Sequence, residues 1–157
     1  MKKILVLVSM FVLICAGQYI VADNMASHAA AAAAPTWGPC PPVFPAGCKM
    51  QVLQGPLDKA GEVFSLRIML PNGYKIAPHY HPTDEHIVIL SGNFHIGMGD
   101  TVDHTKEMLL QKGAFGVAPA NQHHYAWVEG STEFILYGNG PLAMTYVNPA
   151  DDPSTKK

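Results

Sequence analysis

Residues 73–92, which read GYKIAPHYHPTDEHIVILSG, are the stretch that decides the fold of this chain. In an extended strand, side chains alternate between two faces, so His79 and His81 point the same way, about 7 Å apart along the chain. Residues 82–84, Pro-Thr-Asp, favour a short bend. Glu85 then begins an apolar run whose alternate residues share its face. The stretch therefore predicts a β-hairpin that carries two imidazoles and one carboxylate on a single face.

A metal ion would explain the carboxylate in this pattern. A glutamate on the inner face of an otherwise apolar strand costs free energy unless a cation compensates its charge. Neutral imidazole nitrogens and a carboxylate oxygen together suit a divalent first-row transition metal. We therefore expect His79, His81 and Glu85 to be metal ligands.

The same residues resemble the first signature of the cupin superfamily, G-x5-H-x-H-x3-E-x6-G, and match it at every specified position from Gly73 to Gly92. The core of the motif is also locally similar to that of germins, the secreted manganese cupins. The resemblance implies an all-β fold, a small antiparallel β-barrel of the jelly-roll type. The whole chain looks most like small exported single-domain bacterial cupins.

The second cupin signature, G-x5-P-x-G-x2-H-x3-N, is matched in part further along the chain, where Pro119 and His124 stand at their expected positions after Gly113. Asn121 replaces a glycine of the signature, a mild change because asparagine also adopts positive φ in turns. Val128 replaces the final asparagine. The family spacing implies His124 as the fourth metal ligand, whereas a strand register shifted by one residue would select His123.

The remaining sequence indicates a β-rich fold independently of this resemblance. Short runs of alternating apolar and polar residues are separated by glycine, proline or asparagine, and no long helical periodicity interrupts them. Many short strands with regular turn signals are typical of a barrel or sandwich. The runs that read as strands are residues 62–70, 92–99, 114–118, 125–129, 132–137 and 142–147.

Length and charge allow one domain and argue against nucleic acid as the partner. The chain has 157 residues, with 10 basic and 12 acidic side chains. Without Lys2 and Lys3 it retains 8 basic and 12 acidic residues, a net charge of −4, and no basic stripe is visible. We expect a signal peptide (1–22), an Ala/Pro-rich extended arm (23–50), a barrel (51–148) and a polar C-terminal tail (149–157).

The first residues are typical of an export signal. Lys2-Lys3 precedes an apolar run over residues 4–16, and Ala22 offers a cleavage point before Asp23, with Ala29 as a later alternative. An uncleaved membrane anchor over residues 4–21 is the competing interpretation, although it is barely long enough to span a bilayer. We expect cleavage and a periplasmic or secreted protein.

The arm contains Cys40 and Cys48 among several prolines. Export to an oxidising compartment favours a local disulfide between them, and two free thiols are the alternative.

Other polar and aromatic residues have less defined roles. Tyr80 and Asn93 could support the site as hydrogen-bond donors or face outward. Tyr125 and Trp127 could line the cavity, although aromatic residues in strands more often pack, and Trp127 is expected in the core. The remaining histidines are expected on the surface: His28, His86, His95 and His104.

Three histidines and one glutamate would leave one or two open positions on a metal ion, as catalytic sites require. Iron or manganese is favoured, and nickel, copper, cobalt and zinc are also compatible with these donors. The first hypothesis is a metal-dependent oxidoreductase, dioxygenase-like, that acts on a small oxygen-rich organic molecule. The alternative is a barrel that binds a metal or small ligand without catalysis.

A third interpretation, a metal-assisted isomerase, would need an acid–base pair, for which Lys75 and Tyr125 are candidates by elimination. No catalytic residue beyond the ligands and no organic cofactor is predicted. The expected partners are a small molecule and, as in many cupins, a second copy in a homodimer, with no membrane contact after processing.

Overall fold

The computed structural model describes residues 36–156. The predicted signal peptide (1–22), the alanine tract at residues 29–34 and His28 lie outside the described residues. Within the described part, no helix is long and apolar enough to cross a membrane.

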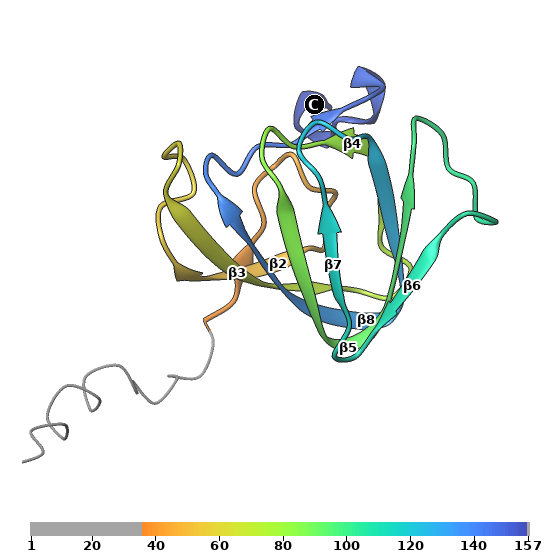
Figure 1. The fold of residues 1–157 in the computed structure, drawn as a ribbon, viewed down its shortest axis with the longest axis horizontal. Helices are drawn as coiled ribbons and strands as arrows, with labels where there is room; N and C mark the ends of the chain where they lie inside the picture. The colour runs from red at the N-terminus through yellow and green to blue at the C-terminus, as the bar shows by residue number, and fades with distance from the viewer. Residues whose placement is uncertain (1–35, 157) are drawn as a thin grey trace, which may run out of the picture. The chain divides into compact units, whose positions relative to one another are not determined.

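An antiparallel β-barrel forms the described part of the chain, which confirms the expected all-β fold (Figure 1). The nine strands of residues 36–156 belong to one sheet, and every strand pair in it is antiparallel. Two short 3-10 helices, η1 (Pro149–Asp151) and η2 (Pro153–Thr155), follow the last strand. The strands are β1 (Gly38–Pro39), β2 (Lys49–Gln54), β3 (Val63–Leu70), β4 (Lys75–Tyr80), β5 (Glu85–Met98), β6 (Met108–Gln111), β7 (Phe115–Ala118), β8 (His124–Asn139) and β9 (Thr145–Tyr146).

Two long bent strands, β5 and β8, pair with each other along most of their length and hold the barrel together. The other edge of β5 pairs with β7 near its start and with β6 near its end. The predicted strands at 125–129 and 132–137 are continuous in β8, which bends at Gly130 with φ +78°. Gly92 marks the corresponding bend of β5, where φ is +82° and a Cβ would collide with Thr132.

The core follows the alternation that the sequence predicted for residues 62–70. The inward residues of β3 are 3% exposed or less, while their neighbours are exposed or half-buried. The inward side chains of β5 and β8 complete the interior and include Ile87, Phe94, Val128 and Phe134. Burial of these alternate apolar side chains stabilises the barrel and leaves its outer face for polar residues.

The ends of the described chain differ in part from the expectation. Residues 38–54 form an edge hairpin, β1–β2, whose loop is closed by the predicted disulfide Cys40–Cys48. The run at 142–147 contributes only the two residues of β9, because residues 140–144 make few ladder bonds. β2 and β6 were not predicted, since neither shows a clean alternation of apolar and polar residues.

Candidate metal centre

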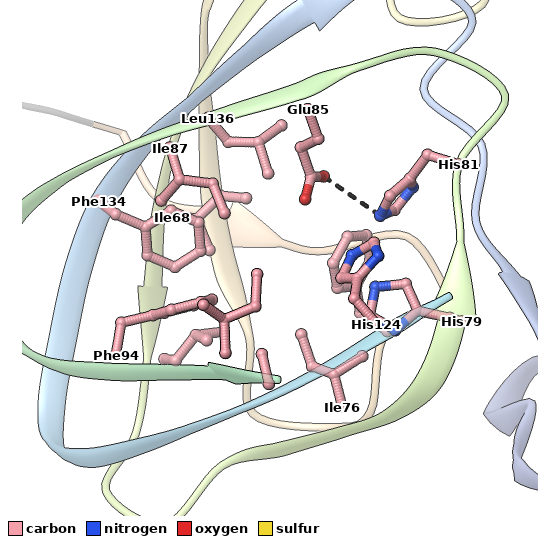
Figure 2. Close-up of a pocket in the computed structure, with 14 residues that line it drawn as sticks. Ile68, Ile76, His79, His81, Glu85, Ile87, Phe94, His124, Phe134 and Leu136 are labelled. Atoms are coloured by element: carbon pink, nitrogen blue, oxygen red, sulfur yellow. Dashed lines mark ion pairs between the residues drawn. The ribbon is translucent and has the colours of Figure 1, made fainter. Parts of the chain in front are cut away.

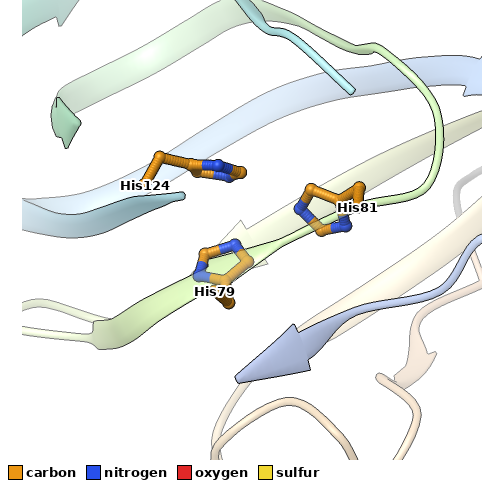
Figure 3. Close-up of side chains that lie close together, drawn as sticks. All are labelled: His79, His81 and His124. Atoms are coloured by element: carbon orange, nitrogen blue, oxygen red, sulfur yellow. The ribbon is translucent and has the colours of Figure 1, made fainter. Parts of the chain in front are cut away.

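Three buried histidines converge inside the barrel from two strands and one turn (Figure 3). His79 lies on β4, His81 directly follows β4, and His124 begins β8. Their exposed fractions are 5% or less, and one ring nitrogen from each lies within 4.8 Å of the others. Three ring nitrogens gathered in this way form a candidate site for one metal ion.

A β-bulge in β4 turns His79 into the barrel. Ile76 pairs with Ala126 and His79 pairs with His124, so three steps along β4 match only two along β8. In a regular strand, residues three apart point to opposite faces. The bulge adds one residue and so places both Ile76 and His79 on the inner face.

Backbone carbonyls fix the orientation of all three imidazoles. His79 Nδ1 lies 2.8 Å from the Ala77 carbonyl oxygen, and His124 Nδ1 lies 3.0 Å from that of Gln122. His81 Nδ1 contacts the Ala143 carbonyl oxygen at 2.8 Å. A carbonyl only accepts hydrogen bonds, so each Nδ1 carries the proton and donates. The lone pair of each neutral ring is therefore on Nε2, the atom left for a metal.

The Nε2 atom of His81 is available to bind a ligand. This atom is buried and has no hydrogen-bond partner among the described residues. Buried polar atoms in native proteins nearly always have one. Burial also lowers the pKa of His79, His81 and His124, with mutual repulsion as a second cause for His79. The rings are therefore neutral at pH 7, as metal ligation requires.

Glu85 lies beside this cluster at the start of β5 (Figure 2). Its Oε1 atom is 3.5 Å from His81 Nε2. No carboxylate oxygen of Glu85 belongs to the cluster of ligand atoms, from the three histidines, that all lie within 4.8 Å of one another. Burial raises the pKa of Glu85 to about 7, and the nearby His124 opposes part of this shift. A bound cation would favour the charged carboxylate and offset the cost of its burial.

The cavity in front of these groups is small and apolar. Its volume is about 20 Å³, and among the described residues the only polar or charged lining side chains are the three histidines and Glu85. The other ten lining residues are aliphatic or aromatic, among them Ile68, Ile87, Phe94 and Leu136 (Figure 2). The site thus combines a concentrated donor set with walls that exclude water.

A family model described as the ChrR cupin-like domain matches residues 28–143 of the chain. The chain belongs to this family of cupins. The match includes the positions of both signatures, and the buried histidines of this cupin are the ones that the two signatures specify. No curated protein sequence matches the chain.

Solved structures with the same fold include proteins that are named for different activities. The DMSP lyase DddQ from Ruegeria pomeroyi DSS-3 is 17% identical with a TM-score of 0.57, over 73% of this cupin and 62% of that chain. The polyketide cyclase RemF from Streptomyces resistomycificus is 17% identical with a TM-score of 0.56, over 69% and 77%. An RmlC-like cupin from Shewanella frigidimarina NCIMB 400 is 19% identical with a TM-score of 0.53, over 67% and 83%. At these identities the similarity shows the fold alone.

Of the two adjacent histidines, the cupin barrel buries His124 and leaves His123 outside. His123 Nδ1 lies 2.5 Å from Asp100 Oδ1, and its ring packs against Tyr80. Tyr80 thus faces outward, and so does Asn93, whose Oδ1 accepts a hydrogen bond from Gln111. The groups that support the histidines are backbone carbonyls instead, which no side-chain pattern in the sequence could have indicated.

Tyr125 and Trp127 do not line the metal cavity, and Trp127 is not in the core, contrary to the expectation. Both alternate with the inward residues of β8 and lie on its outer face, beneath the loop that follows β5. Tyr125 Oη donates to the Asp103 carbonyl, and Trp127 Nε1 donates to Glu107. Trp127 also stacks on His95, with ring centroids 3.9 Å apart. These aromatic residues anchor the loop.

Proposed function

We propose that this cupin binds one divalent transition-metal ion through the Nε2 atoms of His79, His81 and His124, with Glu85 as a fourth ligand. The observation that carries the proposal is the hydrogen bond from each Nδ1 to a backbone carbonyl, which leaves the lone pair of each ring on Nε2 in a cluster of three buried imidazoles. Iron or manganese is the favoured metal, and nickel, copper, cobalt and zinc also suit the donors.

We further propose that the loaded protein is a metal-dependent oxidoreductase of the dioxygenase kind. A redox-active ion with an open position supplies electron transfer and a binding point for dioxygen or a substrate oxygen. The protein orients the ion through fixed imidazoles and excludes bulk water with apolar walls. Glu85, whose Oε1 atom lies 3.5 Å from His81 Nε2, would bind the ion as a charged carboxylate and balance part of its positive charge.

The lining favours a small molecule with an oxygen donor and an apolar remainder. None of the lining residues in the described part of the chain is a lysine or arginine, so among them only the ion would compensate a second carboxylate of a substrate. We propose that the protein acts after export, in the periplasm or outside the cell, which the Cys40–Cys48 disulfide supports.

A non-catalytic barrel that binds a metal or small ligand is the second candidate. It is favoured by the lining that residues 36–156 provide, in which Glu85 and the histidines are the only acid–base side chains. An isomerase is less well supported, because Lys75 and Tyr125 line a separate pocket that contains none of the three histidines.

Elemental analysis of the purified protein tests the metal proposal, beside a His79→Ala/His124→Ala double variant and a His123→Ala control. We expect close to one metal ion per chain in the wild type and the control, and almost none in the double variant. Oxygen uptake by the loaded protein with small hydroxylated or enolic compounds then separates the two candidates. A metal-free wild type after reconstitution with each ion would refute the metal centre.

A further inference from the structure

One apolar side chain that lines the histidine cavity comes from a loop outside the sheet. Of the 14 residues that line this cavity, twelve lie on β3, β4, β5 or β8, and His81 directly follows β4. Phe44 alone comes from the loop between β1 and β2. The strand residues are fixed by the ladder of hydrogen bonds, and the His81 ring is fixed by the Ala143 carbonyl. Phe44 is therefore the part of the lining that can move without opening the sheet.

The same phenylalanine borders the surface on its other side. Together with residues of two loops, it lines a separate surface pocket of about 240 Å³. The other lining residues are Pro41, Val43, Leu142, Ala143 and Met144. Ala143 also supplies the carbonyl that orients His81, so this pocket ends directly beside the metal centre. Phe44 is the side chain that the pocket and the cavity share.

Three restraints hold the loop in place. The Cys40–Cys48 disulfide joins its two ends. Tyr146 Oη donates to the Val43 carbonyl at 2.9 Å, and Tyr74 Oη donates to the Pro45 carbonyl at 2.6 Å. The two buried tyrosines therefore hold the backbone on either side of Phe44 by hydrogen bonds.

We propose that Phe44 is the gate of the metal centre, and that the loop of residues 40–48 must move it aside before a substrate enters from the surface pocket. A cavity of about 20 Å³ holds little more than one water molecule, so a larger ligand requires part of the lining to move. The pocket is lined by apolar side chains, so the gate admits small uncharged molecules in preference to ions. The nature of the substrate rests on the proposed function, whereas the gate itself does not.

Chemical modification of the metal-free protein tests the gate without any metal. Diethyl pyrocarbonate acylates neutral imidazoles, and mass spectrometry gives a rate for each histidine. We expect Phe44→Ala to accelerate modification of His79, His81 and His124 at least tenfold, while the exposed His104 reacts at an unchanged rate. Tyr146→Phe removes one of the hydrogen bonds that hold the loop. It should accelerate modification of the buried histidines about fivefold, the effect of one ordinary hydrogen bond.

Phe94→Ala is the matched control, because Phe94 lines the same cavity but lies in the core on β5. This variant creates a void without removing the gate. The buried histidines should therefore be modified more slowly in it than in Phe44→Ala. Phe44→Trp, which keeps a large ring at the mouth, should keep the wild-type rate or slow it. Equal rates in wild type and Phe44→Ala, or equal acceleration by Phe94→Ala, would overturn the gate.

Metal extraction by EDTA gives a second, independent readout on the loaded protein. EDTA is far larger than the cavity, so we expect loss of the ion to be at least tenfold faster in Phe44→Ala and faster again after reduction of the disulfide. If the wild type binds no metal, the proposed function fails and the modification rates still decide the gate. Equal extraction rates from a loaded wild type and Phe44→Ala would contradict the gate alone.

Discussion

Glu85 is the residue of the candidate site that changes its protonation state near neutral pH. Burial raises its pKa to about 7, whereas burial lowers the pKa of the three histidines and keeps them neutral there. A metal ion must therefore displace a proton from Glu85 below pH 7. We expect the metal affinity to rise about tenfold per pH unit up to pH 7 and to level off above it.

Isothermal titration at pH 6 in two buffers of different ionisation enthalpy measures the released proton directly. Glu85→Gln should bind the ion more weakly and with no pH dependence between pH 6 and 8. His123→Ala, a change outside the cavity, should keep the wild-type profile. A pH slope that survives in Glu85→Gln would assign the proton to another group.

The same carboxyl group makes the metal-free protein less stable at high pH. The pKa of Glu85 in the folded state is about 7, above its ordinary value of 4.5, so its protonated form is the one that folding favours. Stability is unaffected below pH 4.5 and falls as the pH rises through 7, by up to about 3 kcal/mol.

Glu85→Gln should therefore raise the free energy of unfolding of the metal-free protein at pH 8 and change it little at pH 4.5. Urea denaturation at both pH values measures the difference, and equal effects at the two would refute the assignment.

At the scale of elements, the turn before β8 sets the position of His124, the first residue of that strand. Asn121 has φ +59°, and its backbone N–H donates to the His81 carbonyl at 2.8 Å, which ties the turn to the other histidines. Branched side chains are strained in this region by about 1–2 kcal/mol. We expect Asn121→Val to lower the free energy of unfolding by this amount and to weaken metal binding, and Asn121→Gly to preserve both. Thermal melts with metal titrations check this, and a stable, metal-binding Asn121→Val would show that the turn does not set the site.

The elements also show how far the sequence could predict the site. The two signatures specify the positions of His79, His81, Glu85 and His124, because strand alternation and a short bend place them on one face. The bulge in β4 was not predictable, because the extra residue shows only in the pairing with β8. The carbonyls that orient the rings were not predictable either, since every residue has one. The outward placement of Tyr125 and Trp127 depends on a distant loop that covers them.

At the scale of the whole molecule, the candidate site joins parts of the sheet that are distant in sequence. Its four side chains come from β4, the turn after it, the start of β5 and the start of β8. β4 makes few ladder bonds with β8, in two stretches on either side of the bulge. A metal ion shared by these elements would therefore reinforce the pairing of β4 with β8, and it would bind the folded protein far better than the unfolded chain.

Metal-dependent thermal stability follows from this arrangement. At a free metal concentration about 100-fold above the dissociation constant, the folded state gains about 2.7 kcal/mol. For a domain of this size, that gain corresponds to a rise in melting temperature on the order of 10 °C. The rise should be larger at pH 8 than at pH 6, because the proton on Glu85 competes with the ion.

Differential scanning calorimetry with and without EDTA measures this rise in melting temperature. The melting temperature of His79→Ala/His124→Ala should not change with metal, whereas that of His123→Ala should change as in the wild type. A melting temperature that EDTA leaves unchanged in a metal-loaded wild type would mean that the ion binds elsewhere than between β4 and β8.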